Sequence, residues 1–100
     1  MSLANLYTEL RRRAAASGED RALDLKGGAR IAVRVQAEIV TLTISRSKKP
    51  LGATEIETFK RDCGVPSSAI RFPMEGQRTI DREGEIWHAI TYRWAESEAT

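Results

Sequence analysis

Two clusters of basic residues are the first candidates for binding chemistry in this sequence. Arg46, Lys48 and Lys49 place three cations within four residues, just before a predicted helix N-terminus. Free N–H groups and the positive end of the helix dipole attract anions at such a position. If the arginine run 11–13 lies nearby, the clusters would form one patch able to follow a nucleic-acid backbone. The predicted anion-binding or nucleic-acid-binding residues are therefore Arg11, Arg12, Arg13, Arg46, Lys48 and Lys49.

Both clusters also have a purely structural interpretation. Residues 11–13 fall in the last turns of a predicted helix, where cations favour the negative end of the helix dipole. The lysine-rich loop 46–49 is of a kind found on many protein surfaces, and a nearby threonine already accounts for the cap of the following helix. The sequence leaves both interpretations open.

Aromatic residues near the C-terminus indicate a second possible surface. In a predicted strand 86–94, Trp87 points away from the apolar face, toward the side expected to be wetter. Large aromatic side chains at such positions are enriched at protein interfaces. Tyr92 and Trp94 would extend the same surface, so the predicted protein interface comprises Trp87, Tyr92 and Trp94. Its partner is a second copy of the chain or another protein.

The residue types needed for catalysis are scarce. The chain has one histidine, His88, and one cysteine, Cys63. His88 alternates with isoleucines and Cys63 ends an apolar helical stripe, so neither indicates an activated nucleophile or a Cys/His zinc site. The pair Gly27-Gly28 lacks the third glycine and the lysine of phosphate-binding loops. We therefore predict no catalytic residue, no metal, no cofactor and no enzymatic activity.

Composition and charge agree with a binding protein of ordinary globular type. The 100 residues are 41% hydrophobic and 30% charged, with a net charge of +2. Residues 1–50 hold ten Lys and Arg against five Asp and Glu, whereas residues 51–100 hold six against nine. The halves therefore carry +5 and −3, which suits an anionic partner for the first half or two copies paired in opposite orientation.

The sequence gives no indication of a membrane segment or of export. Its longest apolar runs are a few residues, far below the ~20 needed to cross a bilayer. The N-terminus has its apolar residues before its arginines, the reverse of a secretory signal. A lone cysteine forms no internal disulfide. We expect one soluble cytoplasmic domain over residues 1–100, with a frayed tail at 97–100.

Hydrophobic periodicity predicts two helices. Leucines and a tyrosine spaced at i, i+3, i+4 and i+7 predict a helix over Leu3–Ala16, which Ser17-Gly18 ends. Thr54 and Glu57 have the spacing of a capping box at the start of a second helix, Ala53–Cys63. Gly64 and the following proline indicate where this helix stops.

Alternation predicts a three-strand meander between the helices, from strands Arg21–Lys26, Arg30–Gln36 and Ile39–Arg46. A two-residue turn at Ala37-Glu38 places Val35 opposite Val40, Val33 opposite Leu42 and Ile31 opposite Ile44. For the first pair of strands, a three-residue loop over 27–29 places Leu25 opposite Ile31 and Leu23 opposite Val33.

The last third reads as extended. Ile70 and Phe72 alternate before a proline, Gln77–Ile80 forms a second short run, and Ile86–Trp94 forms a long strand. A loop over 82–84 would place Ile80 opposite Ile86. The predicted fold is α+β, an antiparallel sheet of four or five strands with both helices on its apolar face, in the order α-β-β-β-α-β-β.

These observations favour a small non-enzymatic binding or regulatory module that works through protein contacts, as a homodimer. The alternative is a nucleic-acid-binding or phosphate-binding domain that uses the basic loop 46–49 and the arginine run 11–13.

Overall fold

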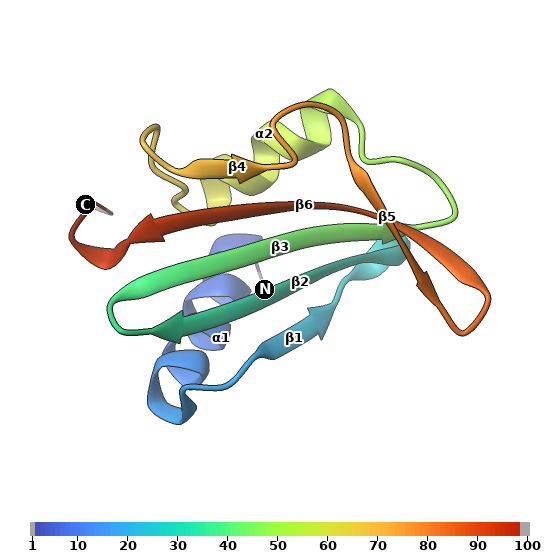
Figure 1. The fold of residues 1–100 in the computed structure, drawn as a ribbon. Coiled ribbons are helices and arrows are strands. Elements are labelled where there is room, and N and C mark those ends of the chain that lie inside the picture. Colours follow the sequence, from blue (N-terminus) through green and yellow to red (C-terminus); the bar gives the residue numbers. More distant parts are fainter. Residues whose placement is uncertain (1, 99–100) are drawn as a thin grey trace.

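The computed structural model describes residues 2–98 and shows an α+β fold (Figure 1). Two α-helices, six β-strands and two short 3-10 turns follow one another in this part of the chain. Their bounds are α1 Leu3–Ser17, β1 Arg21–Asp24, η1 Lys26–Gly28, β2 Ala29–Gln36, β3 Ile39–Ser47, α2 Ala53–Asp62, β4 Ile70–Phe72, β5 Arg78–Arg82, β6 Glu85–Ala95 and η2 Glu96–Glu98.

The strands form one antiparallel sheet in the order β1-β2-β3-β6-β4, and β5 also pairs with β6. The predicted fold class is confirmed, with six strands in place of four or five. The additional strand arises because β4 and β5 share one side of β6. Three residues of β4 pair at the C-terminal end of β6, and five residues of β5 pair at its N-terminal end.

The β2–β3 hairpin has the predicted register. Val35 pairs with Val40, and the other apolar residues of both strands also meet apolar partners. Ala37 and Glu38 both have positive φ, at 50° and 64°. A two-residue turn of this kind matches the right-handed twist of the flanking strands. The six residues predicted to form the apolar face are buried: Ile31, Val33, Val35, Val40, Leu42 and Ile44.

The predicted β1–β2 register was wrong by two residues. Leu23 pairs with Ile31, and the loop between the strands comprises residues 26–28, not 27–29. The reason is conformational: Gly28, at φ 84°, takes the left-handed position that closes the loop, and alanine would be strained there. A shift of two keeps every side chain on its predicted face.

The β5–β6 hairpin also differs from its predicted register. Ile80 pairs with Trp87, not with Ile86, because the turn has two residues, Glu83 and Gly84, both with positive φ. This turn has the same twist-matched geometry as the β2–β3 turn. Ile86, predicted on the apolar face, is 44% exposed at this outer end of the hairpin.

Both helices lie on the same side of the sheet, behind it in Figure 1. Tyr7, Leu10 and Ala14 of α1 are buried against the apolar face together with Phe59 of α2 and Cys63 just after it. Helix α1 extends to Ser17 and ends at Gly18, which has φ 69°. As predicted, the apolar stripe of each helix covers the apolar side of one sheet layer.

The N-terminal cap of α2 is not the predicted one. The helix starts at Ala53 after Gly52, and the Glu55 carboxylate accepts the Gly52 N–H at 3.2 Å. Thr54 lies within the first turn, so Thr54 and Glu57 do not form the capping box. The Glu55 carboxylate accepts the N–H of Gly52, as the Glu57 carboxylate was expected to accept the N–H of Thr54, so this contact lies two residues earlier than predicted.

Candidate binding surfaces

The lone histidine and cysteine lie in structural positions. Cys63 is buried behind α2, and burial raises the pKa of its thiol to about 12, so it stays protonated at neutral pH. His88 is half-buried in β6, opposite Arg46 on one side and Thr79 on the other. Neither faces a residue that would complete a nucleophile and base pair. Within residues 2–98 no group of three or more His, Cys, Asp or Glu is arranged to hold a metal.

The arginine run of α1 is engaged in ion pairs. Arg11 pairs with Glu96 at 3.3 Å, and Arg12 and Arg13 both pair with Glu9, at 2.6 and 3.1 Å. Hydrogen bonds from these two guanidinium groups lower the pKa of Glu9 from 4.5 to about 2. The Glu96 N–H donates to the Glu38 carbonyl, and Ser97 and Glu98, the first residues of the predicted frayed tail, lie in the short 3-10 turn η2. Residues 99–100 of that predicted tail lie outside the described residues.

Arg46 is a structural residue and not a free cation. Its guanidinium pairs with the Glu55 carboxylate and donates to the Gly27 carbonyl at 3.1 Å, with only 11% of its side chain exposed. It therefore ties the end of β3 to the first turn of α2 and to the β1–β2 loop. Lys48 and Lys49 are exposed, and neither ammonium group has an ion pair within the described part of the chain.

The structure does not bring the two basic clusters together. Arg11 binds Glu96, whose N–H bonds to the residue just before β3, whereas Arg46 lies near the end of β3. Residues 39 and 46 are seven positions apart in β3, so the two clusters lie about 23 Å apart at opposite ends of the strand. The composite basic patch expected from the sequence does not form.

Two of the three aromatic residues predicted at an interface lie in the core. Tyr92 and Trp94 are 4% and 3% exposed and belong to the main apolar cluster. They follow the alternation of β6 and face the helices, because the C-terminal half of β6 is covered by them. The predicted interface therefore keeps only Trp87, which points to the other side of the sheet as expected.

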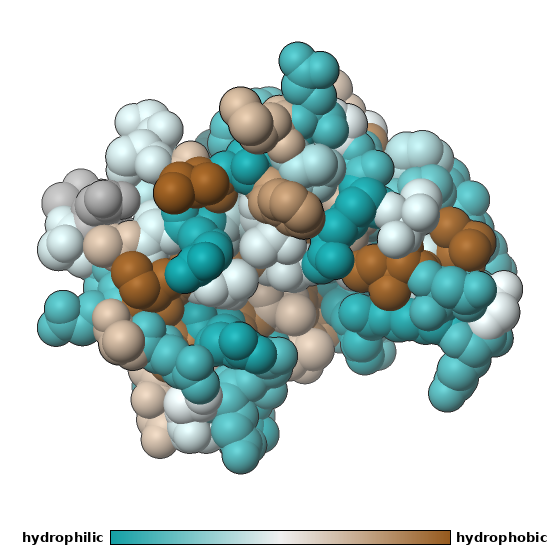
Figure 2. Space-filling view, viewed as in Figure 1, coloured by the Kyte–Doolittle hydropathy of each residue, from teal (hydrophilic) through white to brown (hydrophobic). Residues whose placement is uncertain are grey.

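We call the side of the sheet without helices the open face. Its strand residues meet in rows set by the register: Arg34-Thr41-Arg93-Ile70, Ala32-Thr43-Thr91-Phe72 and Arg30-Ser45-Ala89-Arg78. Figure 2 views this face and shows separate hydrophobic patches among hydrophilic side chains, not one continuous apolar surface. Small and polar residues occupy the middle, and arginines flank them.

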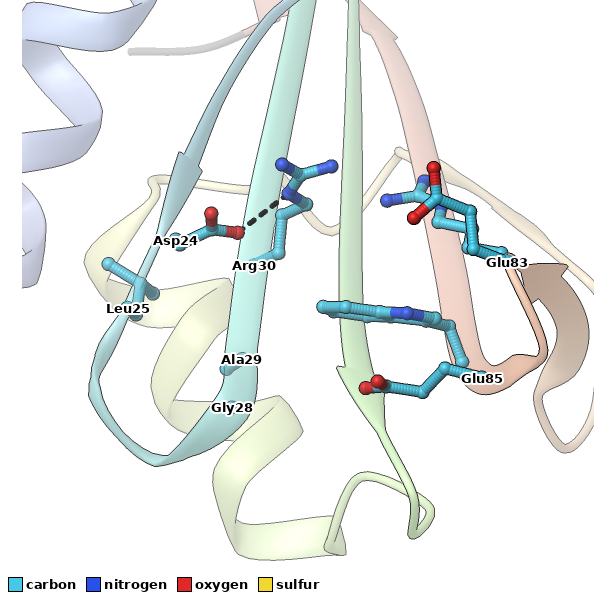
Figure 3. A pocket seen from close by; sticks show the side chains of 9 residues that line it. Asp24, Leu25, Gly28, Ala29, Arg30, Glu83 and Glu85 are labelled. Carbon is cyan, nitrogen blue, oxygen red and sulfur yellow. Dashed lines mark hydrogen bonds and ion pairs between the residues drawn. The ribbon is translucent and has the colours of Figure 1, made fainter.

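A hollow of about 630 Å³ lies at the end of the open face beside the β5–β6 turn. Figure 3 shows its two sides, with the Asp24–Arg30 pair on β1 and β2 facing Glu83 and Glu85 on the hairpin. Trp87 contributes an indole ring to this hollow, with the guanidinium of Arg30 6.0 Å from the ring centroid. Such a hollow combines a flat aromatic surface with charges of both signs.

The middle of the open face is more basic. Two adjoining hollows, of about 230 and 380 Å³, share Arg34 and Thr41. Arg78 lines the first hollow and Arg93 the second. Neither was predicted as a site residue. Alternation places Arg93 on the wet side of β6. Arg78 reaches the open face because Ile80 pairs with Trp87 and not with Ile86, which turns the side chains of β5 to the opposite face from the predicted one.

The free edge of β1 adjoins an apolar groove. The groove has a volume of about 550 Å³ and lies between the start of α1 and the end of β1. Four half-buried leucines line it, Leu3, Leu6, Leu23 and Leu25. Apolar side chains beside an unpaired strand edge mark a site for contact with another chain.

Comparison of the chain with family models, with curated proteins and with solved structures found no match. No helix in the described part of the chain is long and apolar enough to cross a membrane. A functional proposal therefore has to be argued from the surfaces of the chain itself.

Proposed function

We propose that the protein is a non-enzymatic binding module that acts through protein contacts, with a second copy of the chain as its partner. The two copies pair edge to edge through β1, and the leucines beside this strand pack across the interface. The observation that carries the proposal is the combination of an unpaired strand edge with an apolar groove along it.

The backbone of β1 has hydrogen-bonding groups available for this pairing. The Leu25 N–H donates to the Ala29 carbonyl at 2.8 Å, which closes the hairpin with β2. Backbone groups alternate in direction along an antiparallel strand, so those of Leu23 also turn toward β2. The N–H and C=O groups of Ala22 and Asp24 then point outward, away from the sheet.

One antiparallel register suits a twofold-symmetric pair. With Leu23 opposite the second copy's Leu23, each Ala22 faces the second copy's Asp24, and both carry outward backbone groups. A slip by one residue would put the leucines on opposite faces, so it is disfavoured.

The oligomeric state in solution tests this pairing. We expect sedimentation velocity to show a dimer that dissociates in the micromolar range, because β1 is only four residues long. Ala22→Pro removes an outward N–H without disturbing the bonds to β2. Because both copies carry the substitution, the symmetric pair loses two intermolecular hydrogen bonds. At about 1 kcal/mol for each lost bond, the dissociation constant should rise at least tenfold.

Ala22→Ser is the matched control, because it keeps the N–H and changes only an exposed side chain. It should dimerise like the original chain. A chain that stays monomeric at millimolar concentration, or a dimer that Ala22→Pro leaves unchanged, would contradict the proposal.

The alternative of nucleic-acid binding by the two basic clusters has less support. Three of the arginines are paired on the surface of α1 and Arg46 is nearly buried, so Lys48 and Lys49 are the exposed, unpaired cations of that set within residues 2–98. Two lysines on one loop supply little of the counterion release on which such binding depends.

A further inference from the structure

The middle of the open face carries exposed arginines from three different strands. Arg93 and Arg78 form no ion pair within residues 2–98, and Arg34 pairs only with Asp20, at 2.6 Å. Arg34 and Arg93 occupy one row with Thr41 between them, which places their Cα atoms about 10 Å apart. Arg34 donates two hydrogen bonds to Asp20, whereas the guanidinium group of Arg93 has no carboxylate partner within the described residues and can bind a phosphate group.

Hydroxyl groups form the floor between these arginines. Thr43 and Thr91 lie side by side on neighbouring strands, with their Oγ1 atoms 3.0 Å apart. Each is half-buried in the same hollow that Arg34 and Arg78 line. Threonine hydroxyls donate readily to phosphate and sugar oxygens, so the floor offers further polar contacts to a nucleic-acid backbone.

Aromatic rings lie beside this arginine group. Phe72 is 61% exposed on β4, one row from Arg93, and the Arg78 guanidinium lies 6.0 Å from its ring centroid. At the other end of the face the Arg82 guanidinium lies 5.3 Å from the Trp87 ring. Rings on a sheet surface, combined with arginines, provide stacking positions for unpaired bases.

We propose that the open face binds single-stranded nucleic acid. The phosphate groups contact Arg78 and Arg93, and a base stacks on Phe72. Arg93 and Trp87 are six positions apart along β6, which gives the track a length of about 20 Å. It ends there because Glu83 and Glu85 on the hairpin, which have no ion pair within residues 2–98, repel phosphate groups.

This site lies within one chain and does not depend on the dimer. Pairing through β1 would leave the open face free on both copies, since it uses the edge and the helix side of the sheet. An acidic protein segment could use the same arginines, but it would gain little from stacking on Phe72. The ring therefore distinguishes the two kinds of ligand.

Fluorescence anisotropy with labelled oligothymidine and oligouridine of about twelve nucleotides tests the proposal. We expect binding that weakens steeply between about 50 and 200 mM salt. Arg93→Gln and Arg78→Gln should each reduce the slope of log affinity against log salt by about 0.7. Phe72→Leu should weaken binding about tenfold with the salt slope unchanged.

Arg12→Gln is the matched control, because it removes the same charge from the exposed side of α1. It should bind like the original chain, and circular dichroism should show all four variants folded. The proposal fails if no oligonucleotide binds at low salt, or if Arg12→Gln weakens binding as much as Arg93→Gln. It also fails if polyglutamate competes fully and Phe72→Leu has no effect, which would indicate an acidic protein ligand.

Discussion

The ion pair between Arg46 and Glu55 should be one of the main tertiary links in this fold. Arg46 lies at the end of β3 with 11% of its side chain exposed, and Glu55 lies in the first turn of α2 with 29% exposed. The Glu55 carboxylate also accepts the Gly52 N–H, and the Arg46 guanidinium also donates to the Gly27 carbonyl. The pair thus connects three segments at one end of the sheet.

Removing either partner leaves the other charge without its ion pair, but the two substitutions should not cost the same free energy of unfolding. Glu55→Met leaves a guanidinium that is nearly out of water and also removes the cap of α2. We expect it to cost about 3 kcal/mol of unfolding free energy, the lower end for breaking a buried pair. Arg46→Met leaves a carboxylate that is already partly hydrated, so its cost should be about 2 kcal/mol.

Urea unfolding followed by tryptophan fluorescence measures these costs, because Trp94 is buried in the core. The double variant should cost about 2 kcal/mol, less than Glu55→Met alone, because no unpaired charge remains and only the hydrogen bonds to Gly52 and Gly27 are lost. Arg61→Met is the control, as its exposed pair with Asp62 should contribute at most about 0.5 kcal/mol. Additive single costs, or a Glu55→Met cost no larger than the control, would refute the reasoning.

Two further predictions concern single titratable groups. Burial raises the pKa of the Cys63 thiol to about 12, so the folded protein at pH 8 should resist alkylation by iodoacetamide and should react only on unfolding in urea. Mass spectrometry measures the alkylation, and a rapid reaction of the folded chain would contradict the burial of Cys63. Hydrogen bonds from Arg12 and Arg13 lower the pKa of Glu9 to about 2, so the stabilisation from these pairs is present above pH 4.5 and is lost as the pH falls toward 2. An NMR titration of the Glu9 carboxyl group with a midpoint at or above 4.5 would contradict the pairing.

The sequence was sufficient for the elements and for the buried faces of β1, β2, β3 and β6, whereas the one-residue register error at β5 reversed the face predicted for Ile80. Alternation in β2 and β3 predicts their register, because every apolar residue then meets another and a slip by one would expose all of them. The same reasoning tolerates an error of two residues, which is what occurred between β1 and β2. There the glycine that closes the loop decided the pairing, through its positive φ at Gly28.

Burial at the ends of the sheet was beyond the sequence. Ile86 and Trp94 lie on the same face of one strand, yet Ile86 is 44% exposed and Trp94 only 3%, because only the C-terminal half of β6 is covered by helices. Likewise Arg46 and Lys48 read as one basic loop, and only the position of α2 gives Arg46 a carboxylate partner.

Local sequence thus determined the helices, the strands and the apolar sides of the long strands, since these depend on periodicity and on conformational preference over a few residues. The tertiary structure alone decided which charges are neutralised and which remain free. Arg11 finds its carboxylate 85 residues away in Glu96, whereas Arg78 and Arg93 find none in the described part of the chain. Charge pairing depends on distances between segments remote in sequence, and only the packed sheet sets those distances.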